Sequence, residues 1–268
     1  MKSIFLSISL LLSITILNSQ NKIPETVLVK GGTFRMGINE SKYYDEFPDH
    51  TVSLNSFYIG KYEVTIEEYT GFCRTAGLEL PEGEPNMAAT NISWENAILY
   101  CNWLSRVKHI DKCYRIKRDN KNKSFVVSLD KNANGYRLPT EAEWEYTARG
   151  GINRKQYAFS GSNNADEVAW YAGSSNMLHN VGELKPNDLG IYDMSGNAQE
   201  WCFDVYIEKY YKTSPKENPI CEKGSLKRIS RGGSFNDYES SLRITKRYYN
   251  DQNHKAETIG FRVAKNKE

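Results

Sequence analysis

Two stretches in the first quarter of the chain alternate apolar and polar residues. They read VLVKGGTFRMG at 27–37 and HTVSLNSFYIGKYEVT at 50–65. Because neighbouring side chains of a strand point to opposite faces, this pattern is typical of strands with one buried face. The sequence therefore predicts short strands in both ranges.

The period changes to that of an amphipathic helix in two segments with clear start signals. Thr65 and Glu68 have the spacing of a capping box, and Gly77 offers a stop. Ser93 precedes WENAILYCNWLSRV, in which apolar residues recur every three or four positions. We expect a helix after each cap, with one apolar face turned to the core.

Regular periodicity is weak in the rest of the chain. Thr140 and Glu143 form a second capping box, ahead of a short helix that ends at the glycines 150–151. Within 111–136, the segments YRI and SFVVSL flank a polar loop and predict a hairpin. Beyond residue 150 almost nothing is long and periodic, so we expect short strands joined by long irregular segments.

These elements indicate a single α+β domain with low regular secondary structure. No internal repeat, flexible linker or low-complexity block divides residues 26–264. Basic and acidic residues nearly cancel, with 35 Lys and Arg against 33 Asp and Glu and a formal net charge of +2. Since no global field of one sign is present, we do not expect the chain to bind nucleic acid.

The N-terminus has the parts of a secretory signal. Lys2 precedes the apolar run IFLSISLLLSITIL, and small polar residues follow it. We predict a signal peptide over 1–19 with cleavage between Ser19 and Gln20, and hence a periplasmic or secreted protein without an integral membrane segment after cleavage. No Cys stands at the cleavage site to carry a lipid. The alternative reading is a buried N-terminal helix.

Export places the five cysteines in an oxidising compartment, where disulfides form. Because five is odd, at least one thiol stays free or pairs between chains. Cys202 and Cys221 bracket a polar loop that contains proline, and we expect them to form a disulfide. Cys73 with Cys101, on neighbouring predicted helices, is a second candidate.

Common catalytic signatures are missing from the sequence. It contains no P-loop, no GxGxxG after a strand and no GxSxG. The four histidines are isolated and lack the i, i+4 spacing of a zinc-binding helix: His50, His109, His179 and His254.

A series of short motifs is more specific than any of these patterns. In chain order they are GGTFRMG at 31–37, FYIGKYEVT at 57–65, YCNWL at 100–104, RLPTEAEWEYTARGG at 137–151, LGIYDMSGNAQEW at 189–201, RGGSF at 231–235 and GFR at 260–262. Together they resemble the formylglycine-generating, or sulfatase-modifying factor, family over about residues 26–264. The resemblance implies a single domain with a variant of the C-type lectin-like fold.

Arginines and tryptophans within or near these motifs are expected to have structural roles. We expect the guanidinium groups of Arg149, Arg231 and Arg262 to tie carboxylates and loop carbonyls together rather than to contact a substrate. Three tryptophans are expected to act as large apolar anchors in a core with few long elements: Trp144, Trp170 and Trp201.

The DMSGNAQE segment is the strongest local metal candidate. The resemblance implies a calcium site at Asp193 and Glu200, through their side chains, and at Gly196 and Ala198, through backbone oxygens. Calcium prefers hard oxygen ligands of these kinds. The alternative is a turn in which Asp193 caps amides and Glu200 pairs with an arginine. The family's other calcium site aligns roughly with Val168 and Gly173, which offer no side-chain oxygen.

The family's copper centre is not preserved. Its two cysteines align with Asp237 and Leu242, and copper(I) requires soft thiolate ligands. The neighbouring family histidine aligns with Tyr238, and a tryptophan aligns with Gln199, while Ser234 matches. We therefore expect no bound copper. Candidates to line a remaining pocket are Ser234, Asp237, Tyr238 and Gln199.

Three functions follow as hypotheses. The first is an exported, noncatalytic domain that binds a protein partner or a small-molecule ligand. The second is an oxidoreductase of the same superfamily with a pocket chemistry that does not use copper, and the third is formylglycine generation itself, which the missing cysteines disfavour. A deep pocket with paired titratable groups near Ser234 would favour an enzyme. A flat aromatic surface there would favour a partner site.

Overall fold

Two four-stranded sheets occupy the centre of the molecule, and their strand orders do not follow the sequence. The first has the order β1 (Thr26–Val29), β4 (Phe57–Gly60), β12 (Ala264–Asn266), β7 (Tyr136–Arg137), and all its pairs are antiparallel. The second has the order β10 (Tyr248–Asp251), β9 (Lys227–Arg231), β8 (Gln199–Val205), β11 (Ile259–Gly260). Because β1 and β12 both pair with β4, the two ends of the domain are held together in one sheet.

This computed structural model describes residues 21–40, 42–119, 124–153 and 155–267. The predicted signal peptide at 1–19, and the N-terminal helix that was its alternative, lie outside these residues. Within them, no helix has the length and apolarity needed to span a membrane.

Two hairpins complete the strands. One pairs β2 (Gly32–Met36) with β3 (His50–Leu54), and the other pairs β5 (Tyr114–Asp119) with β6 (Ser124–Leu129), as the sequence predicts for 111–136. The predicted strand ranges 27–37 and 50–65 each contain two strands. At Gly31, between β1 and β2, an added Cβ would lie 2.3 Å from the Leu54 carbonyl oxygen, so the close approach of the chain requires glycine.

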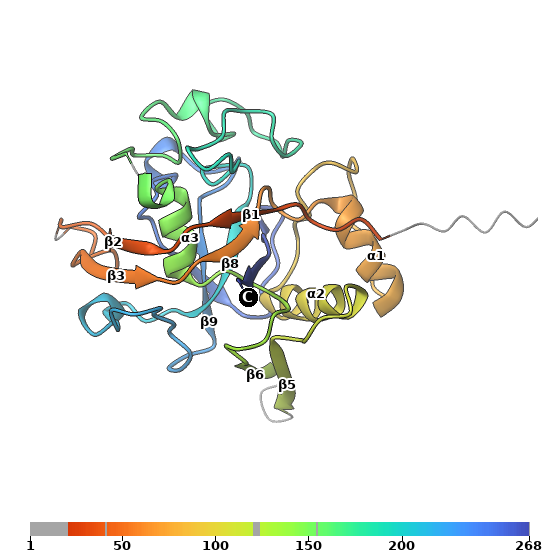
Figure 1. The fold of residues 1–268 in the computed structure, drawn as a ribbon. Helices are drawn as coiled ribbons and strands as arrows, with labels where there is room; N and C mark the ends of the chain where they lie inside the picture. Colours follow the sequence, from red (N-terminus) through yellow and green to blue (C-terminus); the bar gives the residue numbers. More distant parts are fainter. Residues whose placement is uncertain (1–20, 41, 120–123, 154, 268) are drawn as a thin grey trace, which may run out of the picture.

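The three helices that the sequence predicts all begin at their expected caps. They are α1 (Ile66–Ala76), α2 (Trp94–Val107) and α3 (Glu141–Ala148), and both capping boxes form. Figure 1 shows α1 and α2 together at one end and α3 at the other, beside the β2–β3 hairpin. The remaining helical turns are η1 (Gly151–Asn153), η2 (Ala165–Glu167), η3 (Tyr210–Lys212) and η4 (Glu239–Ser241).

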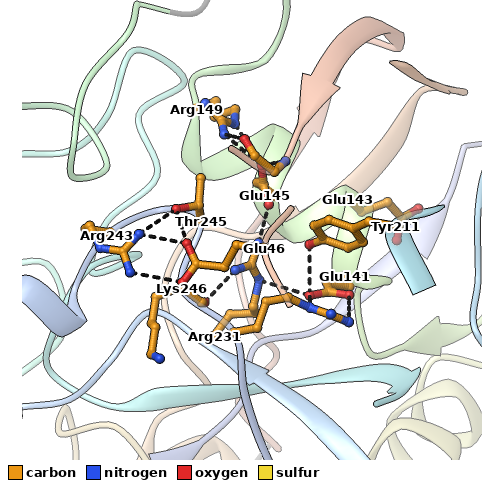
Figure 2. Close-up of polar contacts among 12 residues, drawn as sticks. Glu46, Glu141, Glu143, Glu145, Arg149, Tyr211, Arg231, Arg243, Thr245 and Lys246 are labelled. Atoms are coloured by element: carbon orange, nitrogen blue, oxygen red, sulfur yellow. Dashed lines mark hydrogen bonds and ion pairs between the residues drawn. The ribbon is translucent and has the colours of Figure 1, made fainter. Parts of the chain in front are cut away.

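Buried ion pairs connect the irregular second half of the chain to α3. Glu145 of α3 pairs with both Arg149 and Arg231, and Glu200 pairs with Arg262 (Figure 2 shows the first two pairs). The predicted contacts of these arginines with carboxylates and loop carbonyls are present. Trp144 and Trp201 are fully buried anchors, whereas Trp170 is half-buried and stacks on His179.

The predicted disulfides are wrong. All five cysteines are free and buried. Cys202 packs in the core beside α3, while the Sγ atom of Cys221 lies 3.8 Å from the Lys223 carbonyl oxygen. Cys73 and Cys101 are free thiols within the same core cluster around α1 and α2, and burial raises the pKa of the Cys73 thiol to about 11.

Candidate functional site

The turn after β9 brings together three of the four predicted pocket residues. Asp237 Oδ2 accepts hydrogen bonds from the backbone N–H of Ser234 (2.9 Å) and from its hydroxyl (2.7 Å). Gln199, at the start of β8, donates from Nε2 to the same oxygen at 3.3 Å and accepts from the Ser230 hydroxyl at 3.1 Å. The Asp237 carboxylate is therefore engaged by the chain itself.

The fourth residue, Tyr238, points away from this cluster. Its side chain is 79% exposed, whereas the Asp237 carboxylate next to it also accepts from the Tyr248 hydroxyl at 3.4 Å. The turn thus exposes one aromatic ring to solvent, while its backbone is fixed by the hydrogen bonds to Asp237.

The two positions that align with the copper ligands do not form a metal site. Leu242 is fully buried and packs with Phe159 and Val168. Asp237 offers a hard oxygen, and a soft copper(I) ion requires sulfur. The residues present therefore do not fit copper. In the parts of the chain that the structure describes, no group of three or more His, Cys, Asp or Glu side chains is placed to hold a metal.

In the DMSGNAQE turn, Asp193 caps a backbone amide and Glu200 pairs with an arginine, which are the two contacts expected of a structural turn. Asp193 Oδ2 accepts from the Gly182 N–H at 2.7 Å. Glu200 accepts from Arg262 Nε and Nη2, both at 2.6 Å, and from the indole N–H of Trp144 at 2.8 Å. Gly196 has a φ of 79°, and an added Cβ would lie 2.3 Å from the Trp170 carbonyl oxygen, so the turn needs glycine there.

Glu63 lies next to this turn, although no sequence motif points to it. Its side chain is buried, Oε1 accepts from Asn197 Nδ2 at 3.0 Å, and Oε2 has no hydrogen-bond partner. Burial, followed by the charge of Asp193, raises the pKa of Glu63 well above its usual value. Burial likewise raises the pKa of Asp193 to about 6. A carboxylate between the apolar residues of YEVTI is the signal that could have identified Glu63.

Two neighbouring carboxyl groups, of which Glu63 has an unpartnered buried oxygen, are compatible with a cation. Asp193 and Glu63 could supply hard oxygen ligands. Glu200, by contrast, is already neutralised by Arg262. Asp193 and Glu63 thus fit a calcium ion, whereas Glu200 does not.

A loop around residues 171–183 packs against both turns. The Ala172 N–H donates to the Asp237 carbonyl at 3.0 Å. His179 is not isolated: its Nε2 lies 2.7 Å from the Ser175 hydroxyl, its Nδ1 lies 3.4 Å from Glu183 Oε2, and its ring stacks on Trp170 at 3.8 Å. The Ala172 hydrogen bond places the loop next to the residue that precedes Tyr238.

The larger cavities lie elsewhere. One of about 630 Å³ opens at the end of α3, and one of about 610 Å³ lies between α1 and residues 78–82. Neither is lined by Ser234, Asp237, Tyr238 or Gln199.

Comparisons with known proteins agree with this architecture. A family model described as the sulfatase-modifying factor enzyme 1-like domain matches residues 15–267. A protein of Paenibacillus barcinonensis named chaperone protein LppX is 36% identical, over 91% of this chain and 90% of its own. The formylglycine-generating enzyme of Streptomyces coelicolor is 28% identical, over 89% and 88%. The solved structure of Treponema denticola variable protein 1 superposes with a TM-score of 0.77 at 28% identity, over 90% of this chain and 95% of that one.

Proposed function

The chain belongs to the sulfatase-modifying factor enzyme 1-like family, and we propose that it is an exported member that binds a partner or ligand without the family's oxidase chemistry. This proposal rests on the residues at the two positions that align with the family's copper-binding cysteines. Asp237 is held by Ser234 and Gln199, and Leu242 is part of the core. Neither side chain can be a soft ligand for a metal or a thiol for oxidation.

The surface beside these positions suits binding. Tyr238 is the exposed aromatic side chain of the turn, and aromatic rings are enriched at protein interfaces because they combine a large apolar area with a polar tip. The turn beneath it is fixed by the hydrogen bonds to Asp237, so little conformational freedom is lost on binding. The similarity to a protein named as a chaperone supports a binding role.

Site-specific crosslinking tests the proposed surface. A photoreactive phenylalanine analogue replaces Tyr238 in one variant and Tyr44 in a control, whose side chains are 79% and 73% exposed. We expect ultraviolet light to attach a discrete partner to position 238 in the producing cells, and none to position 44. Equal labelling at both positions, or none at position 238, contradicts a binding site on this turn.

Export and calcium binding are part of the proposal. The signal-like N-terminus supports export, and intact mass of the protein recovered outside the cytoplasm should give a chain that begins at Gln20. A mass that retains residues 1–19 would contradict cleavage. Calcium would be held by Asp193 and Glu63 with the carbonyl oxygens of Gly196 and Ala198, and its role would be to hold the turn that supports the 171–183 loop.

A further inference from the structure

The cavity of about 630 Å³ at the C-terminal end of α3 has a cationic lining. Four of its side chains carry a positive charge and one a negative charge: Arg35, Arg149, Lys155, Arg243 and Asp49. The whole chain has a formal net charge of only +2, so this is a local concentration of positive charge.

The inner wall of the cavity is made by two arginines that are fixed in advance. Arg149 and Arg243 side chains are only 17% and 19% exposed. Arg149 donates from Nε to Glu145 at 2.9 Å and from Nη2 to the Gly37 carbonyl at 2.9 Å. Arg243 makes a bidentate pair with Glu46 at 2.7 and 2.9 Å (Figure 2). A ligand that meets these groups therefore pays little entropy to order them.

Arg149 does not have a carboxylate to itself. Glu145 is shared between Arg149 and Arg231. In the surrounding ion pairs, Arg231 also lies 3.6 Å from Glu141, which pairs with Arg247, and Arg243 pairs with Glu46. Arg149 Nη1, moreover, has no hydrogen-bond partner within the described chain.

Two exposed cationic side chains and two apolar side chains complete the lining at the mouth of the cavity. Arg35 and Lys155 side chains are 58% and 60% exposed, so each can turn towards a ligand from its present partner. Tyr157 and Ile38, both half-buried, also line the cavity. Binding cavities of this kind combine a few convergent polar groups with apolar area.

We propose that this cavity binds a small organic anion, an inference that rests on the binding role proposed above. Its phosphate or carboxylate group pairs with Arg149 and with the two mouth cations, and its carbon skeleton lies along Tyr157 and Ile38. Phosphate and carboxylate each offer two oxygens that can accept a pair of hydrogen bonds from one guanidinium group.

Calorimetric titration with inorganic phosphate and with citrate, each against sodium chloride at equal ionic strength, tests the proposal and distinguishes the two anion types. Calorimetry is preferred to melting because phosphate also stabilises proteins by exclusion from their surfaces. We expect saturable heat for at least one of the two anions, weakening as sodium chloride is added. Absence of saturable heat for both overturns the proposal.

Variants locate the site. Lys155→Glu combined with Arg35→Gln should bind the anion roughly tenfold more weakly, because two exposed ionic contacts are lost. Lys185→Glu combined with Arg115→Gln is the control with the same change of charge, since Lys185 is also 60% exposed, Arg115 is 82% exposed and neither lines the cavity. Equal binding by both variants, each shown to be folded by circular dichroism, overturns the assignment. Tyr238 does not line the cavity, so crosslinking at position 238 and anion binding in the cavity can fail independently of each other.

Discussion

Glu200 and Arg262 form a bidentate ion pair with two N–O distances of 2.6 Å, and neither side chain is exposed. The same arginine donates to the carbonyl oxygens of Gly60 and Tyr192, each at 2.9 Å. One guanidinium therefore connects the first sheet, the DMSGNAQE turn and β8. The resemblance implies Glu200 as a calcium ligand, and in this structure its carboxylate pairs with Arg262.

Arg262→Met should destabilise the fold by about 3–5 kcal/mol, because it leaves the Glu200 carboxylate buried without its partner. The exposed pair Lys22–Glu67 has the same distance of 2.6 Å but side chains that are 44% and 50% exposed, so Lys22→Met should cost about 0–1 kcal/mol. Urea unfolding measures both changes. Similar losses in the two variants would show that burial does not determine the strength of this pair.

The sequence determines the local elements well because their signals are local. Thr65 with Glu68 and Thr140 with Glu143 lie three residues apart, and both capping boxes form as predicted. The site is harder to predict because its contacts join distant residues. Glu63 meets Asn197 across 134 positions, and Glu46 meets Arg243 across 197. No short window of sequence contains either pair.

The cysteines show a further limit of sequence reasoning. The segments that carry Cys202 and Cys221 do run close together, since the Val205 N–H donates to the Cys221 carbonyl at 2.7 Å. Their thiols nevertheless pack into different surroundings. Proximity along a loop predicts neighbouring backbones, whereas a disulfide also requires that the two side chains point at each other.

Stability should fall as pH rises because of Asp204. Burial, followed by the charge of Glu141, raises the pKa of Asp204 from 3.8 to about 7. Between these values the folded state keeps a proton that the unfolded state has lost, so unfolding becomes easier as pH increases, by about 4 kcal/mol across the window. Above pH 7 the contribution no longer changes.

Urea unfolding at pH 5 and pH 8 measures this dependence in the wild type and in Asp204→Asn. The variant loses one acceptor for the N–H groups of Glu141 and Cys221, so its stability is lower at pH 5, but its fall between the two pH values should be smaller. Asp111→Asn, at an exposed position, should keep the wild-type slope. An unchanged slope in Asp204→Asn would assign the pH dependence to other groups.

Calcium should raise the melting temperature through Glu63 and Asp193. A ligand that binds only the folded state adds about 2.7 kcal/mol at a hundredfold excess over Kd. Glu63→Gln should remove most of the difference between calcium and chelator. Glu68→Gln, at a buried carboxylate of the α1 capping box, should lower both melting temperatures and keep the difference. Identical melting of the wild type in calcium and in chelator would leave the turn as a structural element only.

Purified protein that is supplied with copper(I), oxygen and a cysteine-containing sulfatase peptide should make no formylglycine. Copper(I) needs two sulfur donors together, and the chain offers the Asp237 carboxylate and the buried Leu242 side chain. The remaining thiols are buried, and burial raises the pKa of the Cys221 thiol to about 11, so they cannot replace the missing pair. Asp237→Cys with Leu242→Cys should bind copper(I) only weakly, because Leu242 lies in the core and the loss of Asp237 frees Ser234 and Gln199 from their hydrogen bonds.

Peptide mass spectrometry detects formylglycine as a cysteine that has lost sulfur and gained a carbonyl. That product from the wild-type protein would show that the oxidase centre lies elsewhere in this fold.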